Sequence, residues 1–355
     1  MDKFRIDSHK LMFHVDRVSR WLEGADIYPI YAEISPSGSC NHRCTYCGLD
    51  YMGYKPRFLD SGILKARISE LGRLGLKSGM YAGEGEPFLH RDMAGIINHT
   101  KTSGIDVAVT SNGVLFDEDT AAQTLGSITW IKFSVNAGTK ETYAKIHGTR
   151  AEDFDRVMTN IQNAADIRNR LSMPATIGMQ MVLLPENASE AVTLALLAKE
   201  AGADYLVIKP YSQHPRSITR RYDAIDYREH YNLADELQKI SDGRFQVVFR
   251  QETMKKLEQD RKPYEKCMAL PFWTYIDAGA AVWACSAYLG DERFLLGDIN
   301  SSSFEDIWKG EQRKKVMAFV SDSLDISGCR DNCRMDEVNR YLYELKNPAP
   351  HVNFI

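Results

Sequence analysis

The sequence has no long apolar run, and this absence excludes several classes of protein. Among its 355 residues, no uninterrupted apolar stretch approaches the length of about 18 that a membrane-spanning helix needs. Residues 1–20 mix acidic, basic and histidine side chains and lack the apolar centre of a signal peptide. We therefore expect a cytoplasmic protein without membrane attachment.

The chain also lacks a strong excess of charge of one sign. Its formal net charge is −4, and no basic stripe interleaved with aromatic residues appears, so we expect no nucleic-acid partner. Hydrophobic residues make up 44% and charged residues 26%, which are ordinary values for a globular protein. The length suits one large domain and a smaller one.

Cysteine is scarce but concentrated. Three of the seven cysteines, Cys40, Cys44 and Cys47, lie within eight positions, with the spacing Cys-x3-Cys-x2-Cys. In a reducing compartment, clustered cysteines are metal ligands or catalytic groups more often than disulfides. The cluster therefore predicts a metal centre.

Apolar β-prone runs alternate with amphipathic helical runs, which predicts a parallel sheet in an α/β fold. Six such units are too few for a closed eight-fold barrel, so an open or partial barrel is expected. We expect strands at residues 27–34, 78–83, 106–111, 130–135, 176–184 and 204–210. We expect helices at residues 61–75, 92–104, 118–126, 153–171 and 190–202.

The polar motifs of the sequence follow the predicted strands at their carboxyl ends, where such folds place their chemistry. The cysteine triplet follows the first strand. Glycine, polar and basic motifs follow or end later strands at residues 84–87, 110–113, 134–138 and 209–215. Because carboxyl ends of parallel strands meet at one edge, these motifs predict a shared site.

From residue 222 the character of the sequence changes. We expect a helix at 222–240, a strand at 244–250 and a hairpin at 267–285 that turns at 277–280. The hairpin would bring Cys267 and Cys285 together, and Cys329 and Cys333 follow later. Four cysteines can close a second centre completely; structural zinc and unrelated free thiols are the alternatives.

Three thiolates on a loop suit iron–sulfur ligation better than structural zinc, which usually takes four protein ligands. Three ligands to a four-iron cluster leave one iron with an open position. The alternative is a zinc site that takes His42 as its fourth ligand.

The Cys-x3-Cys-x2-Cys motif, with Tyr46 before its last cysteine, resembles the signature of the radical S-adenosylmethionine superfamily. The resemblance implies a partial (β/α)6 barrel and a [4Fe-4S] cluster on the three cysteines whose open iron binds S-adenosylmethionine. Reductive cleavage then gives a 5′-deoxyadenosyl radical, which abstracts a substrate hydrogen. A flavodoxin- or ferredoxin-type protein would supply the electron.

The resemblance extends to the later strand ends. Glu84-Gly85-Glu86 is similar to the family's Gly-Gly-Glu motif, with its first glycine replaced, and Asn136 stands where aspartate is frequent. The residues that it implies for S-adenosylmethionine are Tyr46, Gly48, Gly85, Glu86, Pro87, Ser111, Asn112, Ser134 and Asn136.

The C-terminal region resembles the twitch domain, the short form of the SPASM domain. This implies one auxiliary [4Fe-4S] cluster on Cys267, Cys285, Cys329 and Cys333. The last pair is Cys-x3-Cys, where Cys-x2-Cys is usual. Such a cluster can accept or relay an electron, or only hold the domain together.

The end of the sixth strand carries the best substrate candidates. His214 is a candidate general base, because histidine titrates near neutral pH. Three arginines in six positions, Arg216, Arg220 and Arg221, could bind phosphate or carboxylate, or could be a solvated loop. The further candidates are Glu33, Lys209, Tyr211 and Gln213.

We therefore expect an enzyme that acts on a small polar molecule such as a sugar, nucleotide sugar or cyclitol. Oxidation is favoured, with epimerisation, dehydration or decarboxylation as other outcomes. The short segment before the first strand disfavours peptide modification, which remains the alternative among enzymes. A non-catalytic iron–sulfur electron carrier is the alternative from another class.

The expected organisation has five parts. A partial barrel core at 27–221 follows an N-terminal extension, and a small β-hairpin and helix domain for the auxiliary cluster occupies 261–340. The remaining parts are the extension at 1–26, a connecting helix and strand at 222–260 and a tail at 341–355.

Overall fold

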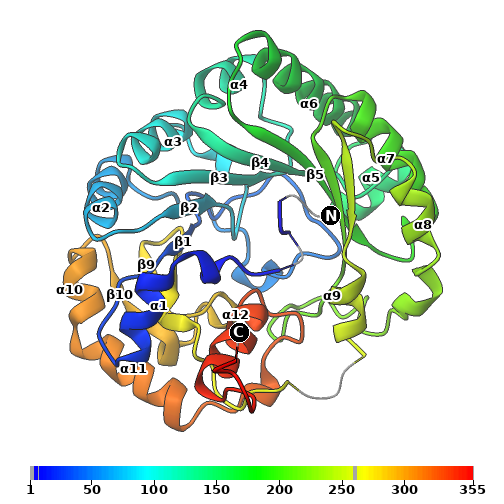
Figure 1. The fold of residues 1–355 in the computed structure, drawn as a ribbon. Coiled ribbons are helices and arrows are strands. Elements are labelled where there is room, and N and C mark those ends of the chain that lie inside the picture. Colours follow the sequence, from blue (N-terminus) through cyan, green and yellow to red (C-terminus); the bar gives the residue numbers. More distant parts are fainter. Residues whose placement is uncertain (1–3, 7, 259–261, 355) are drawn as a thin grey trace.

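The computed structural model describes residues 4–6, 8–258 and 262–354, and its centre is one curved ten-stranded sheet with helices on the outside (Figure 1). The strand order is β10-β9-β8-β1-β2-β3-β4-β5-β6-β7. The strands are β1 (Tyr31–Ile34), β2 (Ser78–Tyr81), β3 (Asp106–Ser111), β4 (Ile128–Ser134), β5 (Thr176–Leu183), β6 (Tyr205–Pro210), β7 (Gln246–Phe249), β8 (Trp273–Ile276), β9 (Ala281–Trp283) and β10 (Leu295–Asp298).

The strands β1 to β7 pair in parallel with their neighbours, and β8 joins β1 in parallel as well. The strands β8, β9 and β10 then pair antiparallel. Because β7 and β10 stand at opposite ends of the order, the sheet is curved but not closed. The prediction of a partial α/β barrel is thereby confirmed.

Helices follow most of the parallel strands and lie on the outer side of the sheet (Figure 1). Several begin at a capping side chain, which typically stabilises a helix by about 1 kcal/mol; the Asp60 carboxylate accepts from Ile63 N at 2.8 Å. The helices are α1 (Val15–Leu22), α2 (Ser61–Arg73), α3 (Met93–Thr102), α4 (Glu118–Thr124), α5 (Lys140–His147), α6 (Glu152–Arg170), α7 (Ala191–Glu200), α8 (Leu233–Gln238), α9 (Gln251–Lys256), α10 (Phe304–Lys309), α11 (Glu311–Asp322) and α12 (Asp336–Lys346).

Two segments differ from the sequence prediction. Residues 222–240 do not form one helix but a short 3₁₀ helix (Tyr227–His230) followed by α8. The Tyr227 hydroxyl donates to Leu183 O and accepts from Tyr211 N, and these tertiary bonds hold the segment against β6. The helix α5 was not predicted, and neither was β10.

Alternation along each strand separates an outer apolar face from an inner face. In β4, Ile131 and Phe133 are fully buried against the helices, whereas Lys132 and Ser134 point to the inner side and keep some exposure. The helices therefore cover one face of the sheet, and the inner face is left for polar groups.

The N-terminal segment packs against the inner face at one end of the barrel. Phe4 and Ile6 contact an apolar cluster of Tyr205, Val207 and Val248, and the Phe4 and Tyr205 ring centroids are 5.2 Å apart. This contact fills the barrel at the amino ends of β6 and β7, so the opposite ends of the strands remain for chemistry. Within the described ranges, no helix has the length and apolar character that a membrane crossing requires.

The predicted hairpin at 267–285 forms β8 and β9, but it does not stand apart from the barrel. Tyr31 in β1 pairs with Trp273 in β8, and Ile34 pairs with Ile276. The C-terminal region therefore continues the barrel sheet. The five-part domain division stays a prediction.

Candidate active site

The cysteine loop after β1 is held by the C-terminal end of α5. Arg43 N donates to His147 O at 2.9 Å, and Thr45 N donates to Ile146 O at 2.8 Å. Gly148 ends α5 with φ +57°, and a Cβ there would lie 2.4 Å from Arg43 O. A left-handed glycine is therefore needed where this helix meets the loop.

The motif after β2 also packs directly on the cysteine loop. Glu86 N donates to Ser39 O at 2.8 Å. A Cβ at Gly85 would lie 2.1 Å from Ser39 O and 2.6 Å from Ser37 O, so no side chain fits there. The backbone at Gly85 therefore fixes the residue that precedes Cys40.

Replacing Gly85 by alanine should displace the cysteine loop. We expect Gly85→Ala to lower stability by about 1–3 kcal/mol through overpacking and to reduce the iron bound per chain after anaerobic reconstitution. The matched control is Gly126→Ala, since a Cβ there meets nothing within 4 Å. Thermal unfolding and iron analysis that gave the same values for both variants would contradict this role.

The replaced glycine of the Gly-Gly-Glu-like motif has a structural explanation. Glu84 is buried and forms an ion pair with Arg57, and its Oε1 accepts from Ala278 N at 3.0 Å. It thus ties β2 to the hairpin turn. The preceding residue, Gly83 at φ +119°, is the one whose backbone comes close to a neighbouring side chain. A Cβ there would lie 2.2 Å from the Tyr275 hydroxyl oxygen.

Glu86 joins the ends of β2 and β3. Its carboxylate accepts from Ser111 Oγ at 2.7 Å and from Asn112 N at 2.8 Å, and burial raises the pKa of the carboxyl. Asn112 Nδ2 donates to Asn41 Oδ1 at 2.6 Å, which reaches back to the cysteine loop. Pro87 begins a short 3₁₀ helix directly after Glu86. The predicted residues of these two strand ends therefore lie together.

Asn136 follows β4, and its side-chain amide is hydrogen-bonded within the protein rather than free to bind a ligand. It is fully buried with φ +58°, a conformation that asparagine tolerates better than most residues. Its Nδ2 donates to Tyr46 Oη at 2.6 Å, and its Oδ1 accepts from Val182 N at 2.7 Å. Asn136 thus positions Tyr46 beside Cys47. Ser134 lies two residues earlier, opposite Gln180 of β5.

The loop after β6 closes over the cysteine loop. Asp50 accepts from Ile218 N at 2.8 Å and from Thr219 N at 2.9 Å, and Ser217 Oγ donates to Cys47 O at 3.2 Å. A Cβ at Gly48 would lie 3.4 Å from the His214 Cβ. The segments after β1 and β6 are therefore in direct contact.

His214 lies in this loop against Tyr51, with ring centroids 5.3 Å apart. Burial lowers the pKa of His214 to about 4, so the imidazole is neutral at pH 7. Its Nε2 is buried and has no hydrogen-bond partner among the residues that the structure describes. Its Nδ1 accepts from Arg216 N at 3.2 Å, so in the neutral ring Nε2 carries the hydrogen and can donate to a bound ligand, which does not suit a general base.

The other candidates in this loop are occupied within the protein. Gln213 accepts from the Tyr211 hydroxyl at 2.9 Å and donates to Thr219 O at 2.9 Å.

The three arginines of this loop are also bound within the protein. Arg216 donates to Leu289 O at 2.7 Å. Arg220 donates to Pro215 O, and Arg221 forms an ion pair with Glu186. The three arginines therefore hold the loop in different directions and do not form one anion site.

A basic group lies on the inner face, and of its members the sequence analysis singled out only Lys209. Burial and neighbouring cations lower the pKa of Lys132 to about 8 and that of Lys209 well below its usual value. The cations whose charges act on Lys209 are Lys132, Arg250, Arg330 and Arg334. We call Lys132, Lys209, Arg250, Arg330 and Arg334 the inner basic cluster.

One predicted carboxylate, Glu33, meets this cluster. It is buried at the end of β1 and pairs with Arg334, which also donates to the Tyr31 hydroxyl at 2.7 Å. The Arg330 guanidinium donates hydrogen bonds to the backbone carbonyl oxygen and to the Oγ of Ser212. Five basic side chains thus gather near Glu33 on the inner face.

Two sequence signals point to this cluster in retrospect. Lys132 shares its face of β4 with Ser134, two positions on, and that serine was already a site candidate. Arg330 and Arg334 each follow a cysteine of the last pair directly. The alternation of β4 and the neighbourhood of the cysteines were the available clues.

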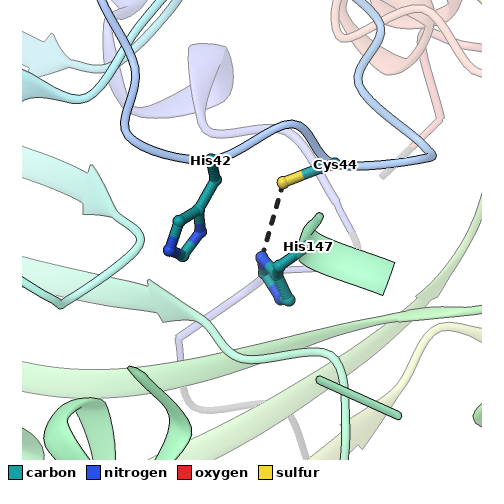
Figure 2. A group of neighbouring side chains, drawn as sticks. All are labelled: His42, Cys44 and His147. Carbon is teal, nitrogen blue, oxygen red and sulfur yellow. Dashed lines mark hydrogen bonds between the residues drawn. The ribbon is translucent and has the colours of Figure 1, made fainter. Parts of the chain in front are cut away.

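Cys44 lies beside two histidines (Figure 2). The Cys44 sulfur is 3.4 Å from His147 Nδ1, and His147 Nε2 is 2.8 Å from Val135 O. Ligand atoms of His42, Cys44 and His147 all lie within 4.8 Å of one another. The expected zinc alternative combined His42 with the three cysteines of the loop, whereas the structure groups His42 with Cys44 and His147.

The four later cysteines line one small cavity, as predicted. Cys267 and Cys285 come from the segments before β8 and after β9, and Cys329 and Cys333 precede α12. Two of their sulfurs have hydrogen-bond donors nearby. Asn339 Nδ2 lies 3.5 Å from the Cys267 sulfur, and Met335 N lies 3.4 Å from the Cys333 sulfur. Such donors stabilise thiolates, so this donor set fits an iron–sulfur cluster.

Burial keeps these thiols protonated in the absence of a cation. It raises the pKa of Cys40 to about 11 and that of Cys267 to about 12. A metal centre supplies the positive charge that buried thiolates need, which is why ligation and deprotonation occur together. Both cysteine sets therefore fit clusters.

Comparison with known families identifies the domains. Residues 34–198 match the family model of the Radical SAM superfamily. The chain thus contains a Radical SAM domain, which confirms the first resemblance. Residues 267–334 match the model of an iron-sulfur cluster-binding domain of the SPASM type, which confirms the second resemblance. These two domains support a four-iron cluster with S-adenosylmethionine and an auxiliary cluster.

Among curated proteins, the chain is similar to GTP 3′,8-cyclases. It is 27% identical over 228 residues to a probable GTP 3′,8-cyclase of Saccharolobus solfataricus, covering 62% of this chain and 65% of the relative. It is 29% identical over 153 residues to the GTP 3′,8-cyclase of Chlorobaculum tepidum, covering 42% and 43%. The chain thus spans less than two thirds of the length of these relatives.

Solved structures show the same fold. SuiB of Streptococcus suis bound to S-adenosylmethionine superposes with a TM-score of 0.66 at 15% identity, covering 96% of this chain and 80% of that one. The enzyme anSMEcpe with bound AdoMet gives a TM-score of 0.56 at 16% identity, covering 90% and 100%. At these identities the likeness concerns the fold alone.

These comparisons correct the expected reaction. Oxidation of a sugar, nucleotide sugar or cyclitol is wrong as the leading function, and carbohydrate biosynthesis falls with it, because the curated relatives are named for a reaction of GTP. The electron-carrier alternative falls because the chain is a radical SAM enzyme. Peptide modification gains nothing from a likeness in fold alone. The expected oxidation had rested on an auxiliary cluster that can accept an electron, and that feature does not identify a substrate.

Proposed function

We propose that the protein is a radical SAM enzyme that abstracts hydrogen from a phosphorylated purine nucleotide of the GTP type. The inner basic cluster is the observation that carries the substrate class. Five basic side chains of the chain gather on the inner face near Glu33. A triphosphate would bind such a group through charge-assisted hydrogen bonds, which are the stronger kind.

Cys40, Cys44 and Cys47 would hold the four-iron cluster, because they are the three sulfurs of the loop fixed by Gly85, Gly148 and Asp50. When bound, this cluster and S-adenosylmethionine supply a 5′-deoxyadenosyl radical. The polar groups at the ends of β2 and β3 and the Tyr46 ring border the same loop. We assign to them the binding and orientation of S-adenosylmethionine, with a flavodoxin- or ferredoxin-type reductant.

The auxiliary site has consequences for how the substrate is held. Its four cysteines, Cys267, Cys285, Cys329 and Cys333, can ligate every iron of a four-iron cluster. A closed cluster offers no open position to a nucleotide base. Protein side chains must therefore hold the substrate, and the cations of Arg330 and Arg334 extend from the auxiliary cysteines to the inner face.

Isotope transfer tests the proposal directly. We expect reconstituted, reduced enzyme to form 5′-deoxyadenosine faster with GTP than with S-adenosylmethionine alone. With GTP deuterated in the ribose, mass spectrometry should find deuterium in the 5′-deoxyadenosine. Guanosine, which has no phosphate, is the matched control and should give little transfer. If 5′-deoxyadenosine forms but never carries deuterium from GTP, the nucleotide assignment fails while the radical chemistry stands.

A further inference from the structure

The group His42, Cys44 and His147 has features of a ligand site of its own. His42 is 1% exposed, and neither of its ring nitrogens has a hydrogen-bond partner among the residues that the structure describes. A buried imidazole with two unsatisfied nitrogens is costly, so it calls for a partner that the protein does not supply. The Cys44 sulfur and the second imidazole lie on the side where such a partner would bind (Figure 2).

The surroundings of His147 select the tautomer that a metal requires. Val135 O lies 2.8 Å from His147 Nε2, and a carbonyl oxygen can only accept, so Nε2 carries the hydrogen. The lone pair is then on Nδ1, which lies 3.4 Å from the Cys44 sulfur. Ligating histidines usually donate their other nitrogen to a carbonyl or carboxylate in this manner.

An acidic side chain also lies near His42, beyond hydrogen-bond distance. Asp153 Oδ2 lies 3.8 Å from His42 Nε2 and also accepts from the Thr149 hydroxyl. This distance is too long for a hydrogen bond, so Asp153 acts on the His42 ring through its negative charge, which favours a cation there. Two nitrogens and one sulfur are a donor set that zinc and cobalt favour, with a fourth position left for water.

We propose that, in the cluster-free chain, His42, Cys44 and His147 bind one divalent transition metal ion of the zinc type. Binding converts the Cys44 thiol to a thiolate and releases its proton to solvent. Since Cys44 is also assigned to the four-iron cluster, the ion and that cluster exclude each other. The site would therefore let zinc block cluster assembly before iron arrives.

Cobalt binding to the full-length, cluster-free chain tests this site, because thiolate–cobalt charge-transfer bands count sulfur ligands. We expect about two Co²⁺ per chain, one at the auxiliary cysteines and one at the proposed site. Cys44→Ser and the double variant His42→Gln/His147→Gln should bind about one. Cys40→Ser and Cys47→Ser, the matched controls, should still bind about two. Zn²⁺ should displace both ions.

Two results would overturn the proposal. The first is a second cobalt ion that is lost in Cys40→Ser or Cys47→Ser and kept in the histidine double variant, which would assign it to the three thiols. The second is a single ion in the wild type. The cobalt ion bound at the auxiliary cysteines shows, in every variant, that the chain is folded. If the histidine variant loses that signal too, the comparison of Cys44→Ser with Cys40→Ser decides the question.

Discussion

Replacing Cys40, Cys44 and Cys47 together by alanine should abolish 5′-deoxyadenosine formation while leaving the auxiliary cluster in place. These are the sulfurs of the loop that β1, β2 and α5 hold, whereas the later cysteines line a separate cavity. Iron per chain after anaerobic reconstitution should fall from about eight to about four. Iron and sulfide analysis and chromatography of the nucleoside product measure both effects.

The complementary variant is the control for that experiment. Cys329→Ser/Cys333→Ser should lose the auxiliary iron and retain about four irons at the first cluster. Reduced enzyme of this variant should still cleave S-adenosylmethionine slowly. Product formation that survives the triple alanine variant would disprove the assignment of the first cysteine set. Loss of all iron in both variants would mean that the two sites depend on each other for folding.

Replacing Lys132 and Lys209 by methionine should weaken GTP binding strongly. Each ammonium lost removes a charge-assisted hydrogen bond worth about 1.5–3 kcal/mol, which corresponds to about a 10- to 100-fold rise in Kd. Methionine retains much of the length and the apolar stem of lysine. Lys101→Met, on the outer face beside Asp106, is the matched control and should change the Kd little. Calorimetry with GTP and with guanosine separates phosphate binding from base binding.

The same cluster predicts a pH dependence. Burial lowers the pKa of Lys132 to about 8, with Arg334 and Arg250 also lowering it and Glu33 opposing them. Lys132 is therefore charged below this pH and neutral above it, so GTP affinity should fall as the pH rises through about 8. Lys132→Met should flatten that fall. An equal pH dependence in the variant would assign the titration to another group.

The positions of strands β1 to β6 could be predicted because each depends on a local pattern. Apolar runs and the intervening helical periodicity mark β1 to β6, and the motif positions at their ends follow from parallel pairing. The helix α5 was missed because its sequence, KETYAKIH, spans only eight residues, and its buried side chains are only Tyr143, Ile146 and His147. The final strand, β10, covers four residues and pairs only with β9.

The inner basic cluster could not be predicted in the same way. Alternation places Lys132 opposite the buried face of β4, but the inside of a barrel and a solvent-exposed face give the same pattern in sequence. Arg330 and Lys209 are brought together by tertiary folding across more than a hundred residues. Likewise, nothing local relates Cys44 to His147, whose side chains meet at 3.4 Å. Contacts of this range become visible only in the folded chain.

The pairing of β1 with β8 sets an order on biosynthesis. Tyr31 leaves the ribosome early, but its partner Trp273 is made after most of the chain. At about 5–20 residues per second, the first strand waits tens of seconds for its second neighbour. During that interval the cysteine loop is attached to an unfinished sheet with one open edge. At that stage β2 and α5, which contact the cysteine loop, have been made, but β8, which pairs with β1, has not. We therefore expect the iron–sulfur cluster to be inserted after translation rather than during it.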